Sequence, residues 1–221
     1  MDAVAVDFVP ERVTPTSLGA IAMQSRSLAR VYQGLWRPIA FALSTGLGAP
    51  GVEEEIRHVI ALVGQCAGPW LDVSCGPGAL LRQLVAAGGS RSVLGLDLSR
   101  PMLERAHIAA PTARLVRADA AELPFEDATF GAITNLAALD LYLDPARVVR
   151  EVARVLAPGG RWVCSTFIAP SRGKRASVFE AASGVRTPTL AELEGWTRDA
   201  GLCRFGHVLF RRYAVAWADS A

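Results

Sequence analysis

Residues 70–80 read Trp-Leu-Asp-Val-Ser-Cys-Gly-Pro-Gly-Ala-Leu, an apolar run followed by a glycine loop, and this stretch decides the fold. The apolar residues at its start are typical of a buried strand in a parallel sheet. Gly76 and Gly78 lack a Cβ, so the backbone after this strand can turn sharply and approach a ligand closely. Asp72 places a negative charge just before the turn, which suits a ligand carrying a cationic ammonium rather than a bare pyrophosphate.

A dinucleotide-binding loop is the first alternative for this stretch. Its fingerprint, G-x-G-x-x-G, needs a third small residue and seats the pyrophosphate on a helix N-terminus. Leu81 stands at the third position here, so the fingerprint is broken. A plain strand-to-helix turn is the second alternative, because a glycine pair after a strand is not specific by itself.

More strand-like runs follow, separated by helices or polar loops. Residues 93–97 end in an acid about 20–25 positions further on, where α/β nucleotide folds place a carboxylate against ribose hydroxyls. Ser99 is expected to cap the next helix, with Pro101 in its first turn. A helix with a valine stripe is expected from about 145 to 156, ended by Pro-Gly-Gly at 158–160. The other predicted strands cover residues 115–120, 130–135 and 162–167, with two more between 203 and 217.

Four motifs in order give the run 70–167 a specific resemblance. It resembles the ubiquinone/menaquinone C-methyltransferase-like group of class I S-adenosylmethionine-dependent methyltransferases. The N-terminal Tyr-Gln-Gly-Leu-Trp-Arg (32–37) is similar to the tyrosine and Trp-Arg segment of that family. The four motifs are Asp-Val-Ser-Cys-Gly-Pro-Gly (72–78), Leu-Gly-Leu-Asp-Leu-Ser (94–99), Arg-Ala-Asp-Ala-Ala-Glu-Leu-Pro-Phe (117–125) and Val-Leu-Ala-Pro-Gly-Gly (155–160).

The resemblance implies a doubly wound α/β fold with a mostly parallel, seven-stranded sheet whose last strand is antiparallel. It also implies two parts in the chain. Residues 1–50 would form an arm and an N-terminal helical lid, with residues 1–16 as a loose arm, and residues 51–221 would form the S-adenosylmethionine-binding methyltransferase domain. At 221 residues the chain has the natural size for this architecture.

The resemblance further implies a cofactor, S-adenosylmethionine, which leaves as S-adenosylhomocysteine. Asp72 and the glycine-loop backbone would hold its methionine part, and Asp97 would bridge the ribose hydroxyls. Asp119 with the Ala120 backbone would meet the adenine edge, unless Asp119 only forms an Asx turn. The expected cofactor-binding residues are Asp72, Ser74, Gly76, Pro77, Gly78, Asp97, Leu98, Met102, Asp119, Ala120, Asn135 near the sulfonium, and Tyr32 and Arg37 closing over the site.

Asp140 is the candidate catalytic residue. Methyl transfer is an in-line displacement that gains from alignment and exclusion of water, and it needs a general base only when the acceptor is not already nucleophilic. Many relatives carry a histidine where Asp140 stands. The acid could deprotonate a hydroxyl or bind a cationic amine, or it could be a hydrogen-bonded loop acid. The chain's three histidines are expected to be structural, and no metal-ligand spacing is present.

The composition of the chain limits which kinds of partner and location we expect for the protein. The net charge of +2 comes without a basic stripe interleaved with aromatics, so nucleic acid is not expected. The apolar stretches are shorter than the roughly 20 residues that span a bilayer. Scattered cysteines and an acidic N-terminus without a signal-peptide pattern favour reduced thiols and a cytoplasmic location. The oligomeric state stays open.

The expected partner is a small methyl acceptor. Apolar residues between 21 and 41 hint at a hydrophobic or aromatic molecule, such as a secondary metabolite or a quinone precursor, although core packing explains them equally. O-, C- and N-methylation remain open. Two other classes compete: a protein that binds S-adenosylmethionine without methylating, in a rearrangement or as a regulatory module, and a nicotinamide-dependent oxidoreductase.

Overall fold

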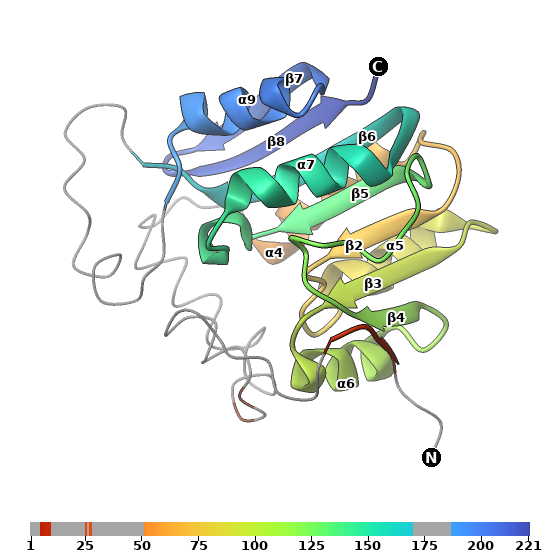
Figure 1. Ribbon diagram of the computed structural model, residues 1–221. Coiled ribbons are helices and arrows are strands. Elements are labelled where there is room, and N and C mark those ends of the chain that lie inside the picture. Colours follow the sequence, from red (N-terminus) through yellow and green to blue (C-terminus); the bar gives the residue numbers. More distant parts are fainter. Residues whose placement is uncertain (1–4, 10–24, 26, 28–50, 170–186) are drawn as a thin grey trace.

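The computed structural model describes residues 5–9, 25, 27, 51–169 and 187–221 (Figure 1). The expected helical lid, including Tyr32 and Arg37, lies outside these residues. The described parts form a twisted sheet with helices on both faces, which confirms the expected α/β architecture.

The sheet has eight strands in the order β1-β4-β3-β2-β5-β6-β8-β7 within the described residues. All neighbours pair in parallel except β8, which runs antiparallel to both β6 and β7. The strands are β1 (Val6–Asp7), β2 (Trp70–Val73), β3 (Val93–Asp97), β4 (Arg114–Arg117), β5 (Phe130–Leu136), β6 (Leu156–Phe167), β7 (Cys203–Phe210) and β8 (Tyr213–Asp219).

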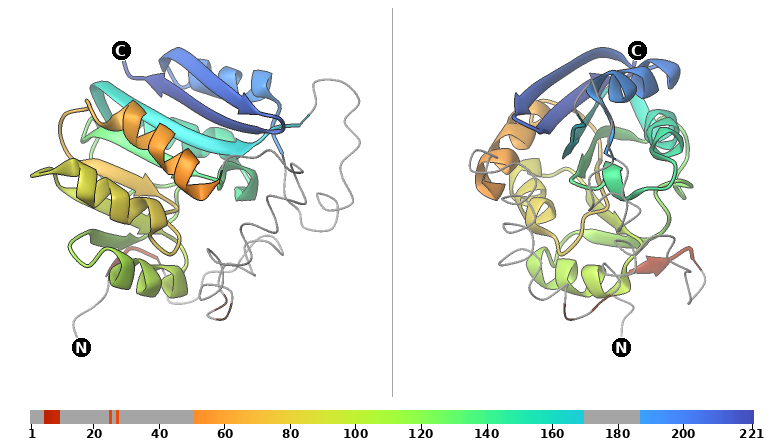
Figure 2. Two further views of the ribbon diagram at one scale, coloured as in Figure 1. Left: turned by 180° about the vertical axis from the view of Figure 1, so that it is seen from behind. Right: turned by 90° about the vertical axis from the view of Figure 1, so that its left-hand side faces the viewer.

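Helices cover the two faces of the sheet in two groups, as the front and back views show (Figures 1 and 2). On one face, Val59 and Leu84 belong to a buried apolar cluster that packs onto β2 and β3. On the other face, Val152 and Leu193 belong to a second cluster. The first group is α4 (Val52–Val63), α5 (Ala79–Gly88) and α6 (Arg100–Ala109); the second is α7 (Pro145–Val155) and α9 (Leu190–Asp199).

The edge strand β1 lies within the stretch 1–16 that was expected to be a loose arm, so that expectation is wrong for Val6–Asp7, and β1 adds an eighth strand to the seven expected. Val6 pairs with Val116 of β4, and the Phe8 N–H donates to the Arg117 carbonyl at 2.9 Å. The Asp7 carboxylate bridges Arg100 at 2.6 Å and Arg117 at 3.2 Å. This pairing satisfies the outer edge of β4, which would otherwise present unpaired backbone groups. A two-residue strand is too short to produce an alternating pattern in the sequence.

Strand β6 begins earlier than the sequence suggested, because Pro158-Gly159-Gly160 lies inside it rather than before it. The register with β5 jumps from Phe130 opposite Leu156 to Ala132 opposite Arg161, so the Pro-Gly-Gly forms a bulge in the ladder. Gly159 adopts a φ of +71°, which glycine reaches without strain.

Candidate functional site

The carboxyl ends of the parallel strands meet at one edge of the sheet. β2 lies between β3 and β5, so strand order reverses there, and open α/β sheets bind ligands at such a crevice. Asp72 lies in β2, and Asp97 and Asn135 lie at or near the ends of β3 and β5. Three of the expected residues are therefore brought together by the topology.

The glycine loop connects β2 to α5 and is held against β3. The Cys75 N–H donates to the Leu96 carbonyl at 2.9 Å. Gly78 has a φ of +86°, and a Cβ there would lie 2.9 Å from Ala106 Cα, so this glycine lets α5 pack closely on α6. A Cβ on Gly76 (φ +54°) would meet no atom within 4 Å among the described residues, so this part of the loop faces open space.

Asp97 clamps the glycine loop to the end of β3. Its Oδ2 accepts from the Gly76 N–H at 2.9 Å, and its Oδ1 accepts from the Ser99 N–H at 2.8 Å. Burial raises the pKa of Asp97, and these backbone N–H groups oppose the rise. Asp97 is thus a hydrogen-bonded part of the site and not a freely solvated acid, and each oxygen keeps a lone pair for a ligand hydroxyl.

Asp72 is 2% exposed and only half satisfied. Its Oδ1 accepts from Thr134 Oγ1 at 2.7 Å, while its Oδ2 has no hydrogen-bond partner within the described part of the protein. Burial raises the pKa of Asp72 to about 7, and the charge of Asp97 adds to the rise. A buried carboxylate oxygen without a partner fits a cationic ammonium, such as that of the methionine part of S-adenosylmethionine.

A hydrogen-bonded trio closes the end of β5 onto the glycine loop. Asn135, fully buried, donates from Nδ2 to the Val73 carbonyl and to Tyr142 Oη, both at 2.9 Å. Tyr142 Oη lies 2.7 Å from Ser74 Oγ. Sequence reasoning missed Tyr142 and Thr134, because only contacts across the sheet reveal them.

The predicted adenine side of the site lies at the end of β4 and the start of α6. Asp119 Oδ1 accepts from the Ala121 N–H at 2.9 Å, so the Asx turn that competed with an adenine contact is present. Ala120 next to it is buried. Met102 is 2% exposed, and its N–H donates to the Ser99 cap. The Leu98 carbonyl accepts from Arg117 Nε at 3.1 Å.

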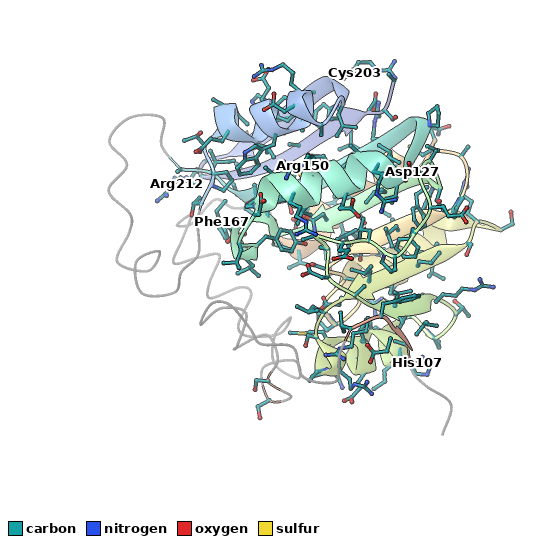
Figure 3. All side chains as sticks on the ribbon, in the orientation of Figure 1. His107, Asp127, Arg150, Phe167, Cys203 and Arg212 are labelled. Atoms are coloured by element: carbon teal, nitrogen blue, oxygen red, sulfur yellow. The ribbon has the colours of Figure 1, made fainter. Side chains whose placement is uncertain are left out.

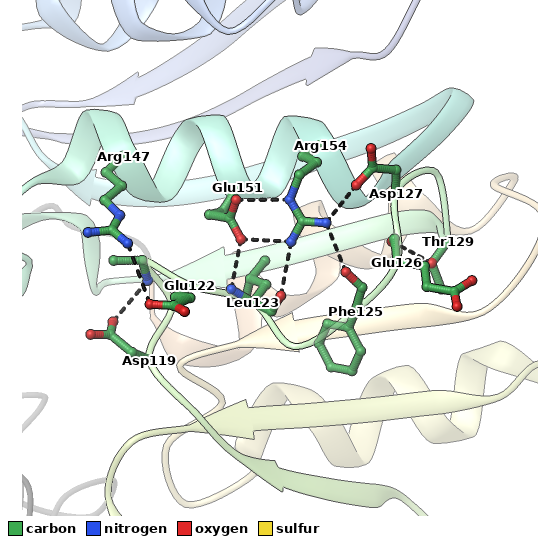
Figure 4. A network of polar contacts seen from close by, with 11 residues as sticks. Asp119, Glu122, Leu123, Phe125, Glu126, Asp127, Thr129, Arg147, Glu151 and Arg154 are labelled. Atoms are coloured by element: carbon green, nitrogen blue, oxygen red, sulfur yellow. Dashed lines mark hydrogen bonds and ion pairs between the residues drawn. The ribbon is translucent and has the colours of Figure 1, made fainter. Parts of the chain in front are cut away.

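A side-chain network holds the long connection between β4 and β5, which runs alongside α7 without forming a helix (Figure 4). Arg154 on α7 pairs with Glu151 at 2.8 Å and with Asp127 at 2.7 Å. It also donates to the carbonyls of Leu123 and Phe125 at 2.9 and 2.8 Å. The Glu151 carboxylate accepts from the Leu123 N–H at 2.8 Å. Two of the five guanidinium donors thus supply partners to backbone carbonyls of the connection, and the other three bind the Glu151 and Asp127 carboxylates.

Asp140 lies in a short 3₁₀ turn (Leu139–Leu141) after β5 and is 7% exposed. Both sides of this turn are anchored. The Ala137 N–H donates to the Ser165 carbonyl at 2.8 Å and to its Oγ at 3.1 Å, and Tyr142 contacts Ser74. The turn therefore has a fixed position beside the predicted sulfonium end of the cofactor.

A second buried polar cluster lies at the same edge of the sheet, where β6 ends and β8 begins. Tyr213 Oη donates to Glu55 Oε1 at 2.5 Å and lies 2.6 Å from Ser165 Oγ, which donates to the same carboxylate oxygen. All three residues are 1% exposed or less. Phe167 packs edge-on against Tyr213, with ring centroids 5.2 Å apart, and Figure 3 shows it at this edge. No sequence pattern pointed to this cluster.

The histidines lie away from the glycine loop. His58 Nδ1 donates to the Glu54 carbonyl within α4, His107 is in the last turn of α6 (Figure 3), and His207 lies in β7. Among the described residues, no group of three or more His, Cys, Asp or Glu side chains could hold a metal ion. None of the helices in the described segments is long and apolar enough to cross a membrane.

Comparison with known proteins defines the class. Residues 71–164 match the family model of a methyltransferase domain. Over 74% of this chain and 96% of the other, the structure resembles that of an S-adenosylmethionine-dependent methyltransferase from Mesorhizobium loti, with a TM-score of 0.62 and 26% identity. Residues 71–164 thus match a methyltransferase domain, in agreement with the four motifs, and S-adenosylmethionine is the cofactor of the methyltransferases that these motifs resemble.

Two methyltransferases with named substrates are similar in sequence to part of this chain. The chain is 34% identical over 113 residues to the demethylmenaquinone methyltransferase of Thermus thermophilus, covering 49% of this chain and 51% of that one. It is 37% identical over 144 residues to the 27-O-demethylrifamycin SV methyltransferase of Amycolatopsis mediterranei, covering 60% and 53%. The chain spans about half the length of these relatives.

Proposed function

We propose that the protein transfers a methyl group from S-adenosylmethionine to a small, hydrophobic or aromatic acceptor. The observation that carries this proposal is the Asp72 carboxylate, because its Oδ2 has no hydrogen-bond partner within the described part of the protein. This carboxylate lies beside the open glycine loop, which Asp97 on the neighbouring strand β3 binds. Relatives named for demethylmenaquinone and 27-O-demethylrifamycin SV support a small-molecule acceptor.

Each strand end then has one task. Asp72 Oδ2 binds the ammonium, Asp97 binds the ribose hydroxyls, and the Asp119–Ala120 turn contacts adenine at the end of β4. The cofactor supplies a methyl group on a sulfonium, whose charge disappears during transfer. Asn135, fully buried at the end of β5, helps to exclude water from that end.

The parts of the cofactor follow the strand order, from adenine at β4 to methionine at β2. The methyl group therefore points toward the ends of β5 and β6 and the start of β8, and the acceptor binds there. Phe167 and Asp140 lie in that direction. Asp140 accepts the proton of an acceptor hydroxyl or pairs with an acceptor amine.

Calorimetric titration tests the cofactor site. S-adenosylmethionine and S-adenosylhomocysteine should bind in the micromolar range and NAD should not. Asp72→Asn removes one charge without changing shape and should weaken S-adenosylmethionine about 10- to 100-fold. Asp199→Asn, an exposed acid on α9, is the matched control. Binding of NAD alone would refute the proposal.

A turnover assay tests the chemistry. Phenols and hydroquinones are incubated with methyl-labelled S-adenosylmethionine, and label in the organic product is counted together with S-adenosylhomocysteine. Once an acceptor is found, Asp140→Asn should lower kcat and leave the KM for S-adenosylmethionine unchanged. Cofactor binding without any S-adenosylhomocysteine across the acceptors would favour a protein that uses the cofactor without methylating.

A further inference from the structure

Tyr142 is a partly buried group at the cofactor site to which the proposed function gives no task. It follows the 3₁₀ turn that carries Asp140, and its hydroxyl reaches back across the end of β5 to the glycine loop. Ser74 and Asn135, its two partners, are 68 and 7 residues away in the chain. The charges of Asp97 and Asp119 also act on this phenol, which places it among the expected site residues.

The donors in this trio have one consistent direction. Asn135 Nδ2 has two hydrogens, and they go to the Val73 carbonyl and to Tyr142 Oη. The reversed amide would set two carbonyl oxygens against each other, so this orientation holds. Tyr142 Oη therefore accepts from Asn135, and Ser74 Oγ at 2.7 Å is the acceptor that the structure offers for the proton of the phenol. Burial raises the pKa of Tyr142 well above its ordinary value, so the phenol keeps that proton.

Ser74 then has a hydrogen left to donate. Its side chain is only partly buried, and its backbone is in the left-handed region, with φ at +55°. A non-glycine residue adopts that conformation only at a cost in free energy. The hydroxyl is thus held at the start of the open loop, with its acceptor side already used by Tyr142.

We propose that Tyr142 is a positioning residue that orients the Ser74 hydroxyl as a donor to the methionine carboxylate of the bound cofactor. The inference rests on the proposed function for the identity of that cofactor. Asp72 Oδ2 accepts from the ammonium and Ser74 donates to the carboxylate, so the two ends of the amino acid meet groups of opposite character. Because Tyr142 follows the Asp140 turn directly, the same contact ties that turn to the cofactor loop.

Ligands that differ only in the amino-acid part test this role. S-adenosylmethionine, S-adenosylhomocysteine and 5′-methylthioadenosine, which lacks the amino acid, are titrated by calorimetry into the wild type, Tyr142→Phe, Ser74→Ala and the double variant. Tyr142→Phe should weaken the first two ligands about 5- to 20-fold and 5′-methylthioadenosine less than about twofold. The double variant should bind no more weakly than Ser74→Ala, since both remove the same contact.

Tyr213→Phe is the matched control. It also removes a buried phenol hydroxyl, but from the cluster at β8, so it should leave the ratio of the three affinities unchanged. Equal losses for all three ligands in Tyr142→Phe, or additive losses in the double variant, would overturn the inference. If Tyr142→Phe does not fold, the Ser74→Ala variant alone tests the inference. An unchanged affinity of Ser74→Ala for S-adenosylmethionine would then overturn the inference. Failure of the wild type to bind S-adenosylmethionine would instead overturn the proposed function.

Discussion

At the scale of single residues, Asp72 links cofactor binding to pH. Burial raises its pKa to about 7, so in the free protein this carboxyl is largely protonated at pH 6 and largely charged at pH 8. A cationic ligand prefers the charged form. We expect the affinity for S-adenosylmethionine to rise between pH 6 and pH 8 and then to level off. Calorimetry at three pH values checks this, and a flat profile in the wild type would contradict it.

The same carboxyl affects stability in the opposite sense. The folded protein holds the Asp72 proton more tightly than the unfolded chain does, whose pKa is near 3.8. Its contribution to the free energy of unfolding is therefore full below pH 4 and is lost as the pH rises to about 7. In Asp72→Asn, urea unfolding should show a smaller loss of stability over this window than in the wild type. Parallel pH profiles for the two proteins would exclude this role.

Residues adjacent to a motif could be predicted from the sequence, and residues in contact only through the fold could not. Asp72, Asp97 and Ser99 each follow or end an apolar run, so a local pattern identified them. Thr134 meets Asp72 across 62 residues, and Tyr142 meets Ser74 across 68. Such contacts depend on strand register, which a single sequence does not specify.

At the scale of elements, Arg154 holds the connection that leads from Asp119 to β5. Arg154→Lys keeps the charge but cannot reach four groups in a plane, so the Leu123 and Phe125 carbonyls lose partners. We expect a loss of about 1–3 kcal/mol of stability. The affinities for S-adenosylmethionine and 5′-methylthioadenosine should fall by the same factor, because the adenine side moves.

Arg150→Lys provides the comparison for that variant. Arg150 lies on the same helix (Figure 3), and its ion pair with Asp144 is long, at 3.8 Å, and exposed on both sides. Its replacement should change neither the melting temperature nor the ligand affinities. If Arg154→Lys lowers the affinity for S-adenosylmethionine but not for 5′-methylthioadenosine, the network acts on a part of the site other than the adenine side.

The elements that the sequence predicted best are those with a full apolar pattern, such as β2, β3, α4 and α7. The bulge at Pro158-Gly159-Gly160 was not predicted, because glycine and proline ordinarily end an element and here a bulge absorbs them. The link after Ala120 was predicted as a polar loop, and the structure confirms that it is not helical. Its contacts were not predicted, since its backbone partners come from α7.

At the scale of the whole molecule, the Glu55, Ser165 and Tyr213 cluster joins α4 to strands β6 and β8. Its members lie up to 158 residues apart and are almost completely buried. Tyr213→Phe leaves the carboxylate with one donor fewer. We expect a loss of about 1–3 kcal/mol in the free energy of unfolding, measured by urea titration. Unchanged stability would mean that the cluster does not join these elements.

The pairing of β1 with β4 has a consequence for the order of assembly. Asp7 meets Arg117 across 110 residues, so β1 leaves the ribosome well before its partner strand exists. At about 5–20 residues per second, the wait lasts on the order of 5–20 s. Because β1 is synthesised first, it is already available when β4 forms, and it can pair with the outer edge of β4 before a neighbouring nascent chain does. The two-residue strand thus protects the growing sheet from pairing with other copies of the chain.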